Sequence, residues 1–149
     1  MKEKSILSRF GLVLLALLAL VLIFPASKID LASPMAASTQ AGVRVEHIQN
    51  FSSSADMTYQ VFSAGDPAFQ QIAEVLSEVS CTKKLNQDYS SYSHAYPVDS
   101  VTVSCYDAAE NHQLLLTVYS DGVCIVNNSF VRVKGGAEAL YQALVKIVE

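Results

Sequence analysis

Asp66-Pro-Ala-Phe-Gln-Gln-Ile-Ala-Glu-Val-Leu-Ser-Glu-Val79 is the stretch that decides the fold class, because its helical pattern interrupts a series of strand-like segments. Asp66 suits the N-cap position, and Pro67 suits the first helical position, where a backbone N–H has no intrahelical partner. Apolar residues then recur at the spacing of one helix face, at Phe69, Ile72, Ala73, Leu76 and Val79. The pattern predicts an amphipathic helix that ends near Cys81, where Lys83 and Lys84 complement the carboxyl end of the helix dipole.

The residues before this helix predict a β-hairpin. Residues 43–48 alternate in part between apolar and polar types, and residues 57–62 are rich in strand formers. The Ser-rich residues 52–56 between them have the composition of a turn.

The residues after the helix predict further strands and a second helix. Alternating or densely apolar segments occupy residues 100–106, 114–119, 122–126 and 130–133. Asp121-Gly122 is a dipeptide that tolerates the positive φ angles of a tight hairpin. Gly135-Gly136 then interrupts the strand pattern before residues 137–148. One apolar stripe of this last segment consists of Leu140, Tyr141, Leu144 and Val148.

This order of elements indicates the α+β class. Both helices must bury an apolar stripe, and the solution for an antiparallel sheet is to pack them on one of its faces. We therefore expect an antiparallel sheet of about five to six strands with two helices packed on one face, over residues 43–149. Roughly a hundred residues form one modest core.

One N-terminal membrane helix is predicted before this domain. A basic start that includes Lys2, Lys4 and Arg9 leads into the uncharged, apolar residues 10–24. The length of this run lies between those of a signal-peptide core and a full membrane span. We expect residues 1–24 to be a signal anchor, with a cleaved signal peptide as the alternative.

The position of the positive charges orients the chain. Because they precede the apolar run, the N-terminus is expected in the cytoplasm and the domain outside it. The protein is then single-pass in the cell membrane with an extracytoplasmic C-terminal domain, or secreted if the signal is cleaved. Residues 25–42 are rich in Ala, Ser and Thr, contain Pro25 and Pro34 and show no period, which is typical of a linker.

This layout resembles a family of unknown function made of short Gram-positive surface proteins with a signal anchor and a small α+β ectodomain. The residues that carry the resemblance are the hairpin at 43–62, the helix start at Asp66-Pro67, the strand pair around residues 119–123 and the final helix with Leu140-Tyr141. The resemblance implies a life outside the cytoplasm and brings no catalytic residues.

Charge limits the classes of partner. From Val43 onward the chain has six Lys or Arg against twelve Asp or Glu, whereas residues 1–42 carry a net charge of +2. An acidic domain is repelled by phosphate backbones and gains nothing from anionic lipid, so nucleic acid is not an expected partner. Membrane contact is expected only through the N-terminal helix.

The three cysteines are at positions 81, 105 and 124. Export permits a disulfide. If the three strands form a meander, Cys105 and Cys124 lie two strands apart, at about 9.5 Å, which is beyond bonding distance. We therefore expect a bridge from Cys81 to either Cys105 or Cys124, with three reduced and buried thiols as the alternative.

No pattern of residues predicts catalysis, a cofactor or a metal. His47, His94 and His112 fall in different elements without metal-ligand spacing, and Glu74 and Glu78 lie on the polar face of the first helix. No nucleophile motif or phosphate-binding loop is present in the sequence. The expected protein is not an enzyme.

One segment, residues 88–97, has the composition of a binding loop. In an extended chain Tyr92, His94 and Tyr96 point to one side, and with Tyr89 they form a candidate binding patch. The alternative is that these rings cover the exposed face of the sheet. We expect a non-catalytic extracytoplasmic binding or accessory domain whose partner is an envelope protein or cell-wall component. An inhibitor or immunity-type protein acting on a secreted or cell-surface enzyme is the alternative function.

Overall fold

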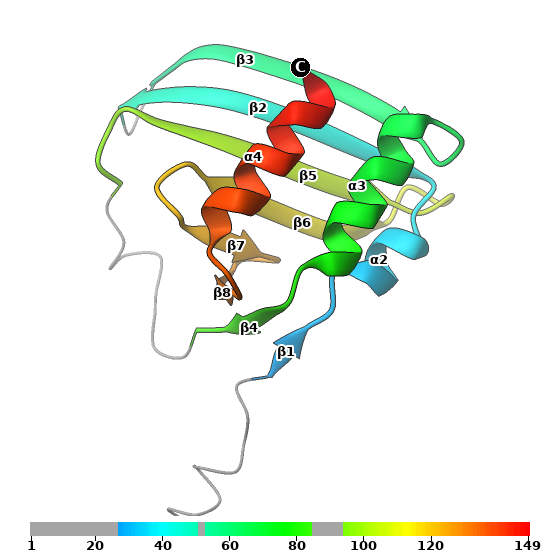
Figure 1. Ribbon diagram of the computed structural model, residues 1–149. Coiled ribbons are helices and arrows are strands. Elements are labelled where there is room, and N and C mark those ends of the chain that lie inside the picture. The colour runs from blue at the N-terminus through cyan, green and yellow to red at the C-terminus, as the bar shows by residue number, and fades with distance from the viewer. Residues whose placement is uncertain (1–26, 51–52, 85–93) are drawn as a thin grey trace, which may run out of the picture.

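The computed structural model describes residues 27–50, 53–84 and 94–149. Within these ranges, eight strands form one antiparallel sheet in the order β1-β4-β8-β7-β6-β5-β2-β3 (Figure 1). The strands are β1 (Lys28–Ile29), β2 (Gln40–Asn50), β3 (Ser53–Ser63), β4 (Cys81–Lys83), β5 (Val98–Tyr106), β6 (His112–Tyr119), β7 (Cys124–Val126) and β8 (Ser129–Val133). The helices are α2 (Ala32–Ala36), α3 (Pro67–Glu78) and α4 (Ala137–Val148). The predicted α+β class with an antiparallel sheet is confirmed, and the sheet is wider than expected.

The described helices cover one face of the sheet, so the molecule has two layers (Figure 1). Helix α4 contacts β5 and β6, α3 packs beside α4, and α2 packs against α3 and β6. The core lies between the layers, because the strands direct alternate apolar side chains toward the helices. Its fully buried members include Met35, Ile72, Leu76, Leu116 and Leu144.

Helix α3 begins where the sequence predicts. Asp66 has an extended backbone at the N-cap position, and Pro67 opens the helix. The Asp66 carboxylate, however, accepts a hydrogen bond of 2.6 Å from the Ser63 N–H, and so closes the turn that leads from β3 into the helix.

The end of α3 differs from the prediction. The helix stops at Glu78, because Val79 takes an extended conformation with φ −81° and ψ 123°. Cys81, expected at the helix end, instead begins β4 and is paired with Val133 of β8. A strand of three residues is too short to show a period of two, which is why the pattern did not reveal it. The last helix, α4, has the predicted bounds.

The segment expected to be a linker is part of the fold over its described residues, 27–42. It contributes β1, α2 and the beginning of β2, and it buries the side chains of Leu31 and Met35 in the core. Pro34 does not prevent the helix, because it stands within the first turn, where backbone N–H groups have no intrahelical acceptor. Asp30 satisfies two N–H groups of that turn through its Oδ1, at 3.0 and 3.1 Å.

The predicted membrane helix, residues 10–24, lies outside the described residues. Among the residues that are described, no helix is both long and apolar enough to span a membrane.

Candidate binding surface

The two faces of the sheet differ in what covers them. In β2, Val43 and Val45 point to the helices, so Gly42, Arg44 and Glu46 point to the opposite face. We call this opposite face, on which none of the described helices lies, the second face. It is the part of the molecule where a partner has access to the sheet.

Strand β3 carries an exposed apolar stripe on the second face. Met57, Tyr59 and Val61 are 62%, 57% and 53% exposed, and they alternate along the strand, so they share a face. Their cross-strand partners are Glu46, Arg44 and Gly42, which places the stripe on the second face. Tyr96 is the one other large apolar side chain that is exposed among the described residues. We call Met57, Tyr59 and Val61 the β3 stripe.

Strand β3 is also an edge of the sheet. In the described part of the chain it pairs with β2 alone, so one side of an eleven-residue strand presents backbone N–H and C=O groups without a strand beside it. Proteins commonly protect such edges with lysine, proline or a bulge. The sequence of β3 has no lysine or proline, and its ladder irregularities occur near the hairpin end, beyond His47 of β2. The edge from Met57 to Val61 is therefore regular and available for pairing, whereas the backbone N–H and C=O of Ser63 are both bonded to Asp66.

The side chains of β3 that point toward the helices anchor the strand to the rest of the domain. The Gln60 side chain donates a hydrogen bond of 2.9 Å to the Val148 carbonyl at the end of α4, and Phe62 packs on the core. On the second face, the ring of Tyr59 lies over Gly42, where a Cβ atom would come within 2.5 Å of the Tyr59 hydroxyl oxygen. These contacts hold β3 and the Tyr59 ring in place, so the surface is already formed before a partner binds.

The charges beside the stripe are balanced. Arg44 Nε lies 3.6 Å from Glu46 Oε2, and Ser54 donates a hydrogen bond to the other carboxylate oxygen of Glu46. Asp56 is the single charged residue within β3. The surface therefore has little net charge, although residues 43–149 as a whole are acidic.

Half of the predicted tyrosine patch falls within the described residues. Tyr89 and Tyr92 lie outside them. His94 Nδ1 is 2.9 Å from Asp121 Oδ2, and its ring packs on Tyr119 with the centroids 4.1 Å apart and on Tyr96 with the centroids 6.0 Å apart. His94 is thus integrated into the second face, and a binding role for the four-residue patch stays a prediction.

The second face has its own small apolar cluster near His94. Tyr119 packs there against buried side chains of β7, β8 and the residue preceding β7, namely Val123, Ile125 and Phe130. This cluster lies at the opposite side of the sheet from β3, since β7 and β8 are separated from β3 by β6, β5 and β2. The β3 stripe and the predicted patch are therefore two separate places.

The expected bridge from Cys81 to Cys105 or Cys124 is not formed in the structure. Cys81 in β4 and Cys124 in β7 lie on either side of β8, and Cys105 in β5 is two strands further away. At about 4.8 Å per strand, Cys81 and Cys124 are separated by about 9.5 Å across the strands alone, and a bridge needs Cα atoms within about 7 Å. All three cysteines are free and buried in the structure. Burial raises the pKa of Cys105 and of Cys124 to about 12, so both are protonated, unreactive thiols at neutral pH.

The fold forms a histidine–carboxylate pair that the sequence pattern does not reveal. His47 Nδ1 and Asp99 Oδ1 are 2.5 Å apart because β2 and β5 place these residues directly opposite one another. Both side chains are more than a third exposed, and the neighbouring Ser120 hydroxyl accepts a hydrogen bond from the Asp99 backbone N–H. The arrangement is a cross-strand polar pair. Residues 52 positions apart show their pairing only when the strand order is known.

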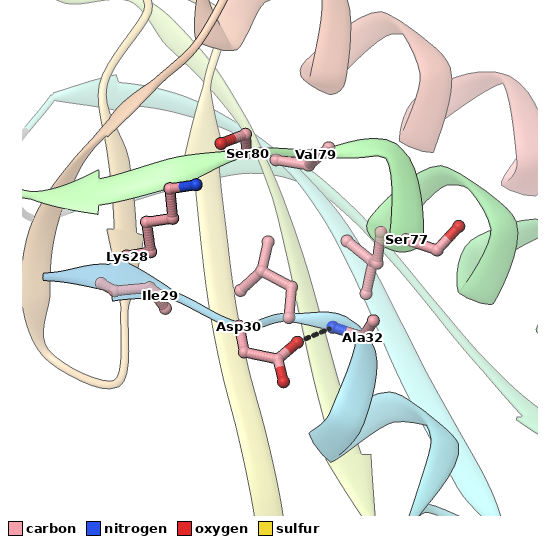
Figure 2. A pocket seen from close by; sticks show the side chains of 9 residues that line it. Lys28, Ile29, Asp30, Ala32, Ser77, Val79 and Ser80 are labelled. Atoms are coloured by element: carbon pink, nitrogen blue, oxygen red, sulfur yellow. Dashed lines mark hydrogen bonds between the residues drawn. The ribbon is translucent and has the colours of Figure 1, made fainter.

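Figure 2 shows a pocket between β1 and the end of α3, with a volume of about 240 Å³. Its lining includes Lys28, Ser77 and Ser80, and its one carboxylate, Asp30, is turned to the Ala32 N–H at 3.0 Å. The pocket therefore offers no acid and base that converge on a substrate. Among the described residues, no group of histidine, cysteine and acidic side chains is arranged to hold a metal ion.

No family model, curated protein or solved structure matches this chain.

Proposed function

We propose that this protein is a non-catalytic binding domain that receives an extended strand of its partner at the β3 edge. The observation that carries the proposal is the coincidence of two features on one strand. The backbone of β3 is unpaired on one side among the described residues, and three of the four exposed large apolar side chains there belong to it. Strand addition uses both features, because the main chain provides affinity and alternate side chains provide specificity.

The exposed apolar side chains of this edge can contribute to the free energy of binding. Burying a Val, Met or similar side chain completely stabilises a complex by roughly 1.5–3 kcal/mol. Each residue of the β3 stripe is more than half exposed, so covering all three provides on the order of 3 kcal/mol. Backbone hydrogen bonds along the strand add to this, and the Tyr59 ring is already held in place by its contact with Gly42.

The place of action proposed is outside the cytoplasmic membrane, with an envelope protein as the partner. The support is the basic start followed by the apolar residues 10–24, which direct the following domain across the membrane. The acidic composition of the exported residues argues against nucleic acid, and the buried thiols of Cys105 and Cys124 are poor nucleophiles. Binding without chemistry fits these properties.

The test is site-specific photocrosslinking of the full-length protein in the cells that produce it. Met57→benzoylphenylalanine places the probe on the stripe, and the same substitution at Gln142, an exposed residue of α4, is the matched control. We expect covalent adducts from position 57 and none of the same mass from position 142. The proposal is overturned if position 57 gives no adduct that the control lacks.

A further inference from the structure

We propose that the strand received at the β3 edge is β3 of a second copy of this chain, related by a two-fold axis that passes beside Tyr59. This inference rests on the proposed function and names its partner. The two eight-stranded sheets then form one continuous antiparallel sheet, and the unprotected edge disappears from both copies at once.

The spacing of the stripe selects the register. In an antiparallel pair centred on Tyr59, residue 59 faces residue 59 of the other copy, and Met57 faces Val61. Every member of the stripe then meets another member on the second face. A shift of the centre to Thr58 would place Val61 opposite Ala55, and a shift to Gln60 would place Met57 opposite Ser63. The register centred on Tyr59 is thus the one in which the apolar residues match completely.

The charge of the strand permits this pairing. Asp56 is the single charged residue of β3, and in this register it faces Phe62 of the other copy. The two Asp56 carboxylates are then six residues apart along the ladder, which corresponds to about 20 Å at 3.4 Å per residue. No like charges meet, and the Arg44–Glu46 pair beside the stripe is balanced within each copy. The polar residues of the other face, Thr58 and Gln60, lie opposite each other.

A self-pairing strand of this kind has a distinctive response to salt. The exported residues of each copy carry an excess of six negative charges, so two copies repel each other at long range. Salt at 0.1 M or above screens such charges beyond about 10 Å, whereas burial of the stripe is not screened. The dimer is therefore expected to tighten as the salt concentration rises.

Cysteine crosslinking tests the register directly in the full-length protein, solubilised in mild detergent. In the proposed pair, Met57→Cys of one chain faces Val61→Cys of another at 4.5–5.5 Å between Cα atoms, a distance that a disulfide spans. We expect a disulfide dimer when the two variants are mixed and oxidised, and none with either variant alone. The native cysteines are buried, so wild-type protein gives the background. Thr58→Cys is the register control and should not crosslink to itself.

A second experiment separates association through β3 from association through the apolar N-terminal residues. Tyr59→Lys places a charge at the centre of the stripe and should shift the full-length protein at least tenfold toward the monomer in sedimentation. Gln142→Lys makes the same charge change on α4 and should leave the dimer intact. Equal association of wild type and Tyr59→Lys, together with absence of the mixed disulfide, overturns the two-fold pairing.

Photocrosslinking at position 57 distinguishes failure of this inference from failure of the proposed function. Adducts between two copies of the chain support both the proposed binding function and the second copy as the occupant of the β3 edge. Adducts with a different protein only, together with no mixed disulfide, leave the β3 edge as a binding site and overturn the second copy as its occupant. No adduct specific to position 57 overturns the binding function itself.

Discussion

The ring of Tyr59 rests on the backbone of Gly42, diagonally across the β2–β3 ladder, because Gly42 has no side chain to occupy that space. A Cβ atom on Gly42 would lie 2.5 Å from the Tyr59 hydroxyl oxygen and 3.1 Å from two ring carbons. Val61 stands directly opposite Gly42, and Arg44 stands opposite Tyr59. An aromatic ring placed over a strand glycine covers exposed backbone and helps to fix the register of the pair. The same contact orients the centre of the β3 stripe.

Replacing Gly42 by alanine should disturb the stripe and spare the fold. The new Cβ displaces the end of the Tyr59 side chain, which is free to move toward solvent, while alanine gains roughly 0.5–1 kcal/mol over glycine in a strand. We expect a melting temperature within a few degrees of wild type and self-association weakened about tenfold, which corresponds to about 1.4 kcal/mol. Calorimetry and sedimentation measure the two effects.

Gly65→Ala is the matched control for this change, because a Cβ at Gly65 meets no atom within 4 Å. It should alter neither Tyr59 nor the association. A Gly42→Ala protein that associates as tightly as wild type would show that the orientation of Tyr59 is unimportant for binding.

Met35 should contribute strongly to stability even though it lies in the segment that the sequence assigned to a linker. Its side chain is fully buried, and its sulfur lies 3.4 Å from Cys105 Sγ. Met35→Ala is expected to lower the free energy of unfolding by about 2–5 kcal/mol, since it leaves a cavity in the core. Gln142→Ala, at an exposed position of α4, should change it by about 0.5 kcal/mol or less. Equal effects in urea unfolding would contradict the burial of α2.

The sequence predicts the long elements of this fold but not the short ones, such as the helix that carries Met35. Long segments with a clear period, such as α3, α4, β5 and β6, were predicted close to their observed bounds. The short elements β1, α2 and β4 have two, five and three residues, and no period can be recognised over such lengths. Leu31 and Met35, four residues apart and near Asp30, were the available sign of α2.

The candidate site was harder to predict than the fold for a different physical reason. Met57, Tyr59 and Val61 alternate in the sequence as buried strand residues do, so their pattern indicates a strand but not which side is exposed. Their exposure follows from the strand order, which puts β3 at an edge and the helices on the other face. Composition instead favours residues 88–97 as a binding loop, because tyrosine and serine are concentrated there.

The three cysteines should all be free in the folded protein. The strand order keeps them too far apart for a bridge, and each thiol is buried. Alkylation in denaturant without reductant should modify three thiols, whereas alkylation of the native protein should be slow. Mass spectrometry counts the modified groups. A product with a single modified thiol would mean that a disulfide forms and that the strand order is different.

Buried thiols should also make the protein less stable at alkaline pH. Burial raises the pKa of Cys105 and of Cys124 to about 12, whereas thiols of the unfolded chain ionise near pH 8.5. Between about pH 9 and 12 the folded state therefore holds more protons than the unfolded state, and the free energy of unfolding falls as pH rises. The slope approaches about 1.4 kcal/mol per pH unit for each thiol.

Cys124→Ala should reduce that slope, measured by urea unfolding at a series of pH values. Val126→Ala removes a buried side chain from the same strand and the same face without removing a titrating group. It should lower stability at every pH and leave the slope unchanged. An unchanged slope in Cys124→Ala would contradict the burial of that thiol.

Acid pH should weaken the turn between β5 and β6 through Asp107. Its carboxylate accepts hydrogen bonds from the backbone N–H groups of Ala109 and Asn111, both at 2.9 Å, and from the side-chain amides of Asn111 and Gln113. These bonds, those from Asn111 foremost, hold the pKa of Asp107 below its ordinary value. The stabilisation is therefore complete above the unfolded pKa of about 3.9 and is lost as pH falls through the lower folded pKa. Asp107→Asn should lower the melting temperature at pH 7, and its difference from wild type should shrink toward pH 3. Glu110→Gln is the control, because it makes the same charge change at an exposed carboxylate of the same turn. If both variants show the same pH dependence, the effect comes from net charge and not from the hydrogen bonds of Asp107.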